Sequence, residues 1–307
     1  MFRANVMKPV TYTVNGQQIC GISNGNEQQP LLLCLHGWLD NAASFQPLMP
    51  YLNDYHVVAI DWPGHGLSSH RGPDAHYHFL DWVYELIALF RAQQWQAIDI
   101  VAHSMGAMVA SAFAAAFPEH IRSLTLIDAI GILTSDTAET TVQLRKGLLS
   151  RLTRHVKPKS THTTIESAVA ARVSVSDLKT EHAALIVKRG IEQTEKGFIW
   201  RSDSRLRATS PYRFTLAQAK QLVADVTPPV QLIYGDKGME MVTTGLACFG
   251  PLYQNLQQHK LLGGHHVHME QPEQTAKLIT ELVKHKKQPE IDKTLGTSSI
   301  ISKAIIC

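Results

Sequence analysis

The sequence predicts an α/β protein with a mostly parallel sheet and helices on both of its faces. Short runs that are apolar throughout, such as residues 31–35 and 98–102, alternate along the chain with longer helical patterns. Continuous apolar runs, unlike alternating ones, are typical of strands that are buried on both faces. With 307 residues, of which 44% are hydrophobic, the chain can bury a core of this kind.

The individual elements can be placed from turn residues and apolar periodicity. Asn15-Gly16 between two alternating segments predicts an antiparallel hairpin at the start of the sheet. After it we expect, in chain order, a strand at 31–35, a helix at 44–52, a strand at 57–60, a helix at 79–94, a strand at 98–102, a helix at 107–117, a strand at 124–127, strands at 230–234 and 256–262, and a helix at 274–286.

The long gap between the sixth and seventh predicted strands indicates an insertion. Residues 131–225 have a helical and polar pattern, and we expect them to form a helical cap, or lid, on a core made of residues 1–130 and 226–286. Residues 287–307 are expected to be a C-terminal tail. The cap carries a basic cluster that is either a solvated helix face or a surface for an acidic substrate or a membrane: Arg145, Lys146, Arg151, Arg154 and Lys157.

Composition excludes several classes of function. A net charge of +3 is too small for the basic field that nucleic-acid binding needs. No signal peptide is recognisable, and no window approaches the about 18 apolar residues of a membrane span, so we expect a cytoplasmic protein without stable membrane insertion. The four cysteines are scattered without a CxxC pair, as free thiols in a reducing compartment would be. The sequence predicts no particular oligomeric state.

The segment Ala102-His103-Ser104-Met105-Gly106 lies between a predicted strand and a predicted helix. A serine on such a turn takes a strained backbone conformation, and the residues two places before and after it must be small so that strand and helix can approach each other. Ala102 and Gly106 satisfy this requirement. Ser104 is therefore a candidate nucleophile, although a helix-capping serine would give the same short pattern.

A general base for Ser104 is expected from a loop at the carboxyl end of another strand. His265 follows Gly263-Gly264 after the last predicted strand, and the glycines allow a sharp turn that points the imidazole toward the sheet edge. His266 and His268 compete for this role, or are structural or substrate-facing. A metal site made by the three histidines is disfavoured, because no carboxylate or cysteine is suitably spaced nearby.

A carboxylate is also required to orient the histidine and to stabilise its protonated form. Asp128 ends the sixth predicted strand and Asp236 ends the seventh, so both would emerge at the same edge of the sheet. Each could instead only cap the turn that follows its strand.

The loop His36-Gly37-Trp38 after the third strand can supply a backbone donor to a developing oxyanion. The expected donors are the amides of Trp38 and Met105, since Gly37 lets the backbone approach the reacting carbonyl. Gly37, His36 and His103 are also expected to border the substrate, although His36 could be a structural loop histidine.

With these residues in view, the chain resembles the α/β-hydrolase superfamily over residues 8–286. The resemblance is carried by five ordered motifs: HGW at 36–38, DWPGHGLSS at 61–69, AHSMGA at 102–107, LID at 126–128 and GGHHVHMEQPE at 263–273. Residues 197–206 and 213–215 are most similar to the serine hydrolase-like proteins. The resemblance implies an α/β-hydrolase fold with an eight-stranded sheet and a lid after strand 6, in which Ser104 is the nucleophile, His265 the base, and the Trp38 and Met105 amides the oxyanion hole.

The sequence departs from the family pattern at two positions. Ala102 stands where glycine is usual, which adds only one methyl group. The acid of many relatives corresponds to Gly238, whereas Asp236 lies two residues earlier. Other branches of the superfamily place the acid about 24 residues beyond the nucleophile, and Asp128 lies 128 − 104 = 24 residues after Ser104. We therefore expect Asp128 to be the acid, with Asp236 as the alternative.

These residues predict a serine hydrolase that cleaves carboxylic esters of small or medium acyl groups through an acyl-serine, without a cofactor or metal. The expected partner is a small ester-like molecule. The same triad could serve a thioesterase, an acyltransferase, a carbon–carbon hydrolase or a cofactor-free perhydrolase. A ligand-binding protein on a hydrolase scaffold, with weak or no turnover, is the alternative from another class.

Overall fold

The computed structural model describes residues 7–154 and 159–284. Within these residues eight strands form one sheet in the order β1-β2-β4-β3-β5-β6-β10-β11, in which β1 and β2 are antiparallel and the strands from β4 onward are parallel. This mostly parallel sheet confirms the predicted fold class. The strands are β1 Lys8–Val14, β2 Gln17–Ser23, β3 Leu31–Leu35, β4 His56–Ile60, β5 Ile98–His103, β6 Ile121–Ile127, β10 Val230–Gly235 and β11 Leu256–Leu261.

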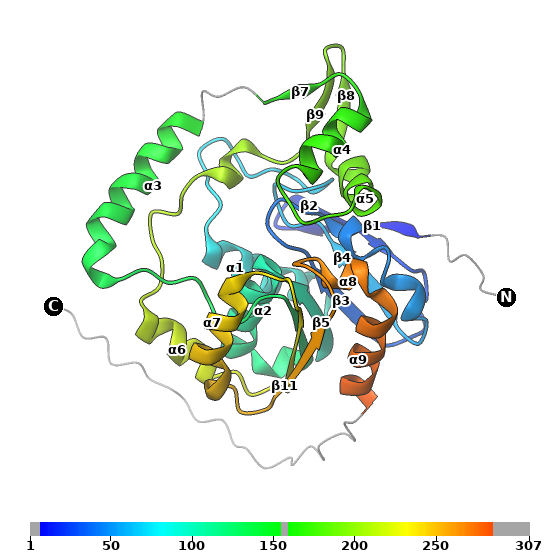
Figure 1. Cartoon of the computed structure of the whole chain (residues 1–307), viewed down its shortest axis with the longest axis vertical. Coiled ribbons are helices and arrows are strands. Elements are labelled where there is room, and N and C mark those ends of the chain that lie inside the picture. The colour runs from blue at the N-terminus through cyan, green and yellow to red at the C-terminus, as the bar shows by residue number, and fades with distance from the viewer. Residues whose placement is uncertain (1–6, 155–158, 285–307) are drawn as a thin grey trace.

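Helices cover both faces of the sheet (Figure 1). In β3, Leu33 and Leu35 join one core and Leu32 and Cys34 join the other, because successive side chains of a strand point to opposite faces. The first core is closed by α1 Phe79–Gln93, α2 Met105–Ala116, α6 Leu216–Ala224 and α7 Glu240–Phe249, and the second by α8 Val267–Glu270 and α9 Pro272–Lys284.

The helix predicted at residues 44–52 is wrong. The structure has two short 3₁₀ helices there, η1 Ala42–Phe45 and η2 Met49–Tyr51. Pro47 and Pro50 explain the difference, since each lacks the N–H that a continuous α-helix would need. The apolar residues of this segment still pack in the second core.

The chain between β6 and β10 contains helices and a three-stranded antiparallel sheet, where the sequence pattern predicted helices alone. Gly197, with a φ of +114°, begins β9 at the turn between the two main strands of this small sheet. The elements of the insertion are η4 Thr137–Glu139, α3 Thr140–Arg154, β7 Thr161–His162, α4 Ile165–Val173, α5 Thr180–Gly190, β8 Ile191–Thr194, β9 Gly197–Trp200 and η5 Ser204–Arg207. The remaining short helices of the chain are η3 Pro118–His120 and η6 Gly250–Leu252.

Helix α5 is one of the elements that attach the insertion to the main body. Asn41 Nδ2 donates to the carbonyl of Ile186 at 2.8 Å, and the Arg189 guanidinium donates to the fully buried carboxylate of Asp61 at 3.0 Å. Because Asp61 also accepts from the backbone of its own body, this ion pair fixes α5 against the loop after β4.

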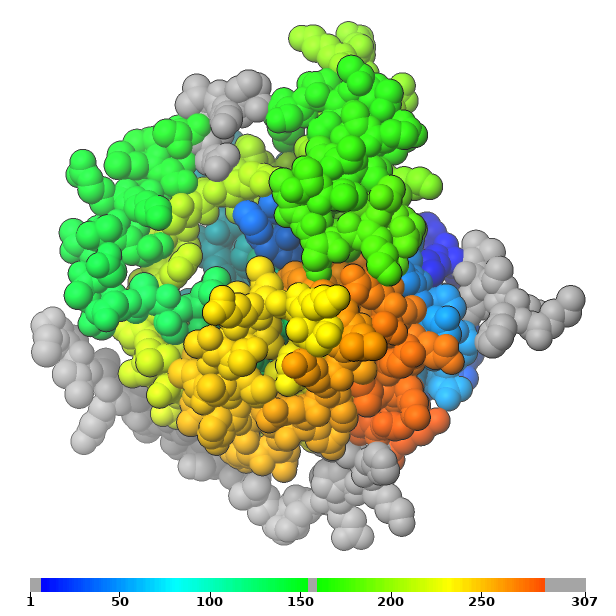
Figure 2. Space-filling view, in the orientation of Figure 1, coloured from blue at the N-terminus to red at the C-terminus, as the bar shows by residue number. Residues whose placement is uncertain are grey.

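The parts of the insertion differ in how closely they lie to the main body. Helix α6, which falls within residues 131–225, packs Ala219 and Val223 into the first core. Helix α3 stands apart on the other side, and Figure 2 shows a hollow in the surface beside it. Arg151, a basic residue of α3, places its Nη2 atom 2.9 Å from His78 Nε2. Lys157 and the expected tail at 287–307 lie outside the described residues. In the described part of the chain, no helix combines the length and the apolar character that crossing a membrane would require.

Candidate active site

Ser104 lies on a sharp turn between β5 and α2. Its φ of +52° and ψ of −119° are outside the regions that ordinary residues prefer, so its side chain is held on a strained bend. Ala102 is fully buried before it. A Cβ on Gly106 would lie 2.4 Å from the carbonyl oxygen of Leu35, which shows how closely α2 approaches β3.

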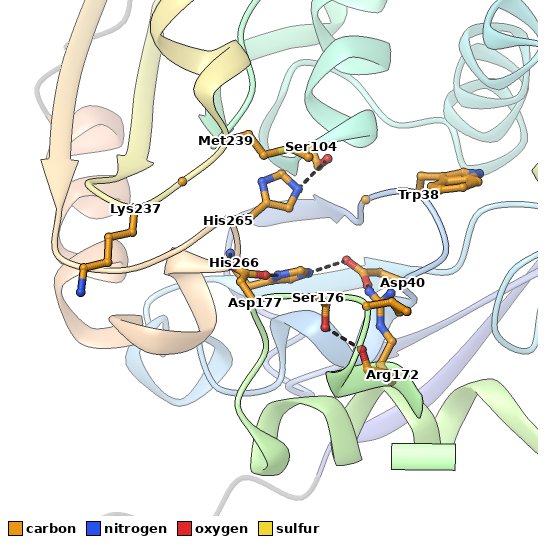
Figure 3. A pocket seen from close by; sticks show the side chains of 13 residues that line it. Trp38, Asp40, Ser104, Arg172, Ser176, Asp177, Lys237, Met239, His265 and His266 are labelled. Atoms are coloured by element: carbon orange, nitrogen blue, oxygen red, sulfur yellow. Dashed lines mark hydrogen bonds and ion pairs between the residues drawn. The ribbon is translucent and has the colours of Figure 1, made fainter. Parts of the chain in front are cut away.

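Ser104, His265 and Asp128 form a continuous hydrogen-bonded series, and Figure 3 shows its Ser104–His265 contact. The Ser104 hydroxyl lies 2.9 Å from His265 Nε2, and His265 Nδ1 lies 2.6 Å from Asp128 Oδ2. The order of the three groups allows the imidazole to accept the hydroxyl proton on one side and to donate to the carboxylate on the other. The three side chains come from residues far apart in sequence, at the carboxyl ends of β5 and β6 and in the loop after β11.

The Asp128 carboxylate is held by the loop that follows β10. Its two oxygens accept from the amides of Gly235 and Met239, each at 3.2 Å, and the backbone of Asp128 has a φ of +45°. A Cβ on Gly238 would lie only 2.2 Å from Asp128 Oδ1. The carboxylate therefore occupies space that any side chain at position 238 would need.

Asp236 does not join this series. It is exposed, and its carboxylate accepts from the amide of Gly263 at 2.8 Å. This contact ties the end of β10 to the turn before His265. Of the two aspartates that the sequence offered, the structure brings Asp128 to the histidine and uses Asp236 to hold its loop.

The predicted oxyanion turn lies beside the serine. A Cβ on Gly37 would be 3.1 Å from the Cβ of Ser104, so the backbone of this loop closely approaches the candidate nucleophile. Met105 is the first residue of α2, where amides have no partner within the helix. The Trp38 indole donates to the carbonyl of Leu206 at 3.0 Å, and its half-exposed ring borders the pocket.

His36 and His103 do not border the pocket as expected. Both are fully buried. His36 donates from Nδ1 to the Gly37 carbonyl at 2.7 Å and accepts the Trp62 amide at Nε2, so it holds its own loop. His103 lies behind the candidate triad, where its Nε2 donates to the carbonyl of His265 at 3.0 Å.

A pocket of about 380 Å³ opens onto Ser104 and His265. One wall comes from the main body and includes Trp38, Gly238 and Met239. The opposite wall comes from the end of α4 and the loop before α5, with Arg172 and residues 175–177. The insertion therefore contributes directly to the cavity in front of the serine.

A cluster of charged side chains lines the pocket, with Asp40 and His266 buried at its centre. Asp40 accepts from Arg172 at 2.5 Å and from His266 Nε2 at 3.2 Å, while His266 Nδ1 donates to Asp177 at 2.8 Å. Burial opposes the charged form of His266, but the two carboxylates outweigh it and raise its pKa to about 9. Burial likewise opposes ionisation of Asp40, yet its cationic neighbours hold the pKa of that carboxyl well below its usual range.

Sequence reasoning missed this cluster because its members are distant along the chain. Asp40 lies two residues after the HGW motif, which is a weak signal. Arg172 and Asp177 lie in the insertion, where no motif marks them. Positions near His266 in the sequence offer no such partner, whereas the fold brings Asp40 to it from the loop after β3 and His103 from the end of β5.

With the fold and the geometry established, comparison with known proteins defines the class. A family model described as the alpha/beta hydrolase fold matches residues 30–272, and the chain belongs to this family. Within the family the chain is close to the serine hydrolase-like proteins. The serine hydrolase-like protein of Danio rerio is 29% identical over 302 residues, which cover 95% of this chain and 91% of that protein.

Two solved structures are also similar over most of the chain. The crystal structure of a hypothetical protein from Pseudomonas aeruginosa PAO1 has 33% sequence identity and a TM-score of 0.83, covering 90% of this chain and 97% of that one. The thioesterase domain from the curacin biosynthetic pathway has 25% identity and a TM-score of 0.80, covering 90% of this chain and all of that one.

Proposed function

We propose that this hydrolase cleaves carboxylic esters of small or medium acyl groups through an acyl-serine intermediate. The observation that carries the proposal is the series of two hydrogen bonds that joins Ser104 through His265 to Asp128. The strained turn at Ser104 and the adjacent pocket of about 380 Å³ support it, because they present the hydroxyl to a cavity of a size suited to a small molecule.

In the proposed reaction the Ser104 hydroxyl attacks the acyl carbon while His265 Nε2 takes its proton. The Trp38 and Met105 amides donate to the oxyanion of the tetrahedral intermediate. His265 then gives the proton to the leaving alcohol, and the acyl group stays on Ser104. In the second half His265 activates a water molecule that releases the acid, while Asp128 stabilises the imidazolium in both halves.

The first test is the reactivity of Ser104. We expect a fluorophosphonate probe to label the wild-type protein at Ser104, and the purified protein to hydrolyse p-nitrophenyl esters. Ser104→Ala should abolish labelling and lower turnover by at least about three orders of magnitude. A folded wild-type protein that neither reacts with the probe nor turns over any ester of a chain-length series would instead favour the ligand-binding alternative.

The second test separates the two aspartates. Asp128→Asn should lower kcat for a p-nitrophenyl ester by a factor on the order of 10³, because an amide cannot stabilise the imidazolium or fix its tautomer. Asp236→Asn should change kcat much less, since Asp236 contacts a backbone amide and not the imidazole. Wild-type turnover by Asp128→Asn would contradict the assignment, and a comparable loss in Asp236→Asn would transfer it.

Thioester hydrolysis is the second candidate. It is favoured by the similarity to the thioesterase domain from the curacin pathway, which extends over 90% of this chain. The same serine and histidine would act, and only the leaving group would differ. Comparing kcat/KM for oxygen esters and thioesters of matched acyl chains would decide between the two, with Ser104→Ala as the blank.

Residues 131–225 are proposed to act as a lid on this site. The support is that Arg172 and residues 175–177 line the pocket that Ser104 and His265 open onto. In such an arrangement the insertion would set the shape of the acyl pocket and exclude water. Exchanging Val175 for a larger residue should therefore shift the preferred acyl length toward shorter chains.

A further inference from the structure

Three donor atoms converge in the charged cluster at the wall of the pocket. Asp40 Oδ2 lies 3.2 Å from His266 Nε2 and 3.6 Å from His103 Nδ1, and all three atoms lie within 4.8 Å of one another. Ligand atoms about 2.0–2.1 Å from a tetrahedral zinc ion are separated by about 3.4 Å. The two distances from Asp40 therefore agree with the spacing of a metal site, and the two imidazole nitrogens lie within 4.8 Å of each other.

The other nitrogen of each imidazole is already engaged. His103 Nε2 donates to the carbonyl of His265 at 3.0 Å, which leaves Nδ1 with its lone pair. His266 Nδ1 donates to Asp177 at 2.8 Å, which leaves Nε2 directed at Asp40. Metal-binding histidines are held in this way, with one nitrogen on a carboxylate or carbonyl and the other on the ion.

One of these donor atoms has no other function in the cluster. His103 Nδ1 is fully buried and has no hydrogen-bond partner among the described residues, although it faces the Asp40 carboxylate. An unpaired polar atom in such a position is costly, and a bound cation would satisfy it. By contrast, both ring nitrogens of His266 and both carboxylate oxygens of Asp40 have hydrogen-bond partners within the cluster.

From this geometry we propose that Asp40, His103 and His266 bind a single divalent transition-metal ion, with Zn²⁺ as the expected occupant. Two imidazoles and one carboxylate are a donor set that zinc prefers. The ion takes the place of the proton that His266 Nε2 shares with Asp40. The site is separate from the Ser104 hydroxyl, and no step of ester hydrolysis depends on it.

The pocket provides access and a fourth ligand. Asp40 and His266 both line it, so a water molecule can reach the ion from that side. Gly37 separates the cluster from Ser104, since a Cβ there would lie 3.0 Å from His103 Nδ1 and 3.1 Å from the serine Cβ. Arg172 holds the second oxygen of Asp40 and so leaves a single carboxylate oxygen for the metal.

The test is a titration of the chelator-treated, full-length protein with Co²⁺ followed by Zn²⁺. We expect one equivalent of Co²⁺ to give the intense visible absorption of a four-coordinate ion, and Zn²⁺ to displace it. His103→Asn and His266→Asn should each lose this signal. The matched control His259→Asn, which removes a histidine of β11 away from the cluster, should keep it, as should His265→Gln.

Several outcomes would overturn the proposal. These are the absence of stoichiometric binding to the folded wild-type protein, a Co²⁺ spectrum that persists in both cluster variants, and loss of the spectrum in His265→Gln, which would assign the ion to the triad. If the cluster variants do not fold by circular dichroism, X-ray absorption of the zinc-loaded wild-type protein decides. It should show nitrogen and oxygen ligands that include two imidazoles, and sulfur ligands would overturn the site.

Discussion

At the scale of single residues, the arrangement depends on Gly238. The Asp128 carboxylate and a side chain at 238 cannot occupy the same space, since the distance to a Cβ there would be 2.2 Å. The position at which many relatives carry their acid is therefore empty of side-chain atoms in this chain. A carboxylate at position 128 and a side chain at position 238 therefore exclude each other. The glycine at 238 leaves the space that the Asp128 carboxylate fills.

This exclusion predicts that the acid can be moved. Asp128→Ala should lower kcat by a factor on the order of 10³. Adding Gly238→Asp to that variant should raise kcat at least about tenfold above that of Asp128→Ala, because the new carboxylate enters the space that Asp128 has left. Steady-state kinetics on a p-nitrophenyl ester measure the recovery. The control Asp128→Ala/Gly238→Asn should not recover, and equal rates for the two double variants would contradict the prediction.

The residues of the site were predictable to different degrees. Ser104 and His265 could be identified because each lies in a short motif with glycine or alanine at positions that only a tight turn requires. Asp128 followed from its distance along the chain. A structural role was one of the alternatives for His36, whereas the buried position of His103 could not be foreseen, because a histidine at the end of a strand looks the same in a sequence whether its ring faces a pocket or the backbone behind it.

At the scale of elements, the contact between β3 and α2 holds the serine in place. Gly106→Ala would place a methyl group 2.4 Å from the Leu35 carbonyl oxygen, so strand and helix would have to separate. We expect unfolding to become easier by about 1–3 kcal/mol, together with a large loss of kcat. Urea denaturation and ester hydrolysis measure the two effects. The neighbouring change Ala107→Gly, which adds no atom, should leave most of the activity.

Elements were predictable where one physical signal dominated. Strand β3 was evident because it is almost entirely buried and apolar throughout, whereas the edge strand β11 is mostly polar and partly exposed. The segment at residues 44–52 has the apolar content of a helix, but its two prolines decide the local geometry. The strands of the small sheet in the insertion are only partly buried, so their sequences lack the continuous apolar runs by which strands of the main sheet were found.

At the scale of the whole molecule, buried histidines predict sensitivity to acid. Burial lowers the pKa of His36 to about 4 and that of His65 to about 3, from 6.5 in an unfolded chain. Between pH 6.5 and about 4 the unfolded chain takes up these protons and the folded chain does not. The contribution of these histidines to the free energy of unfolding is therefore fully present above pH 6.5 and is lost as the pH is lowered. Burial also holds the pKa values of His103 and His268 well below 6.5.

One buried carboxyl acts in the opposite direction. Burial raises the pKa of Glu85 to about 7 despite Arg71, so its folded form gains protons from pH 7 downward, before the unfolded form does. His266, whose pKa is raised to about 9, also opposes the loss between pH 6.5 and 6. Against these two groups, the loss of stability caused by His36 and His65 steepens as the pH falls and reaches about 1.4 kcal/mol per pH unit near pH 5. Urea denaturation at pH 6.5, 6 and 5 should show it. The dependence should be shallower in His65→Gln, and a constant free energy of unfolding over this range would contradict the prediction.

The overall architecture was predictable, whereas the route of the insertion was not. The order of strands and helices follows from alternation along the chain, and right-handed crossovers then leave few topologies. How α4 and α5 lie on the site depends on single ion pairs such as Arg189 with Asp61, whose partners are 128 residues apart. Long-range polar contacts of this kind leave no periodic signal in a sequence.

The position of Asp128 has one more consequence. The candidate nucleophile and the candidate acid both belong to one continuous stretch of chain, from the end of β5 through α2 to the residue after β6, so the end of β10 and the loop after it contribute only backbone amides to the proposed triad. Lys237 and Met239 of that loop border the pocket. Neither side chain takes part in the proposed triad, so a library randomised at these two positions, with glycine kept at 238, should change which substrates are accepted while the chemistry stays intact.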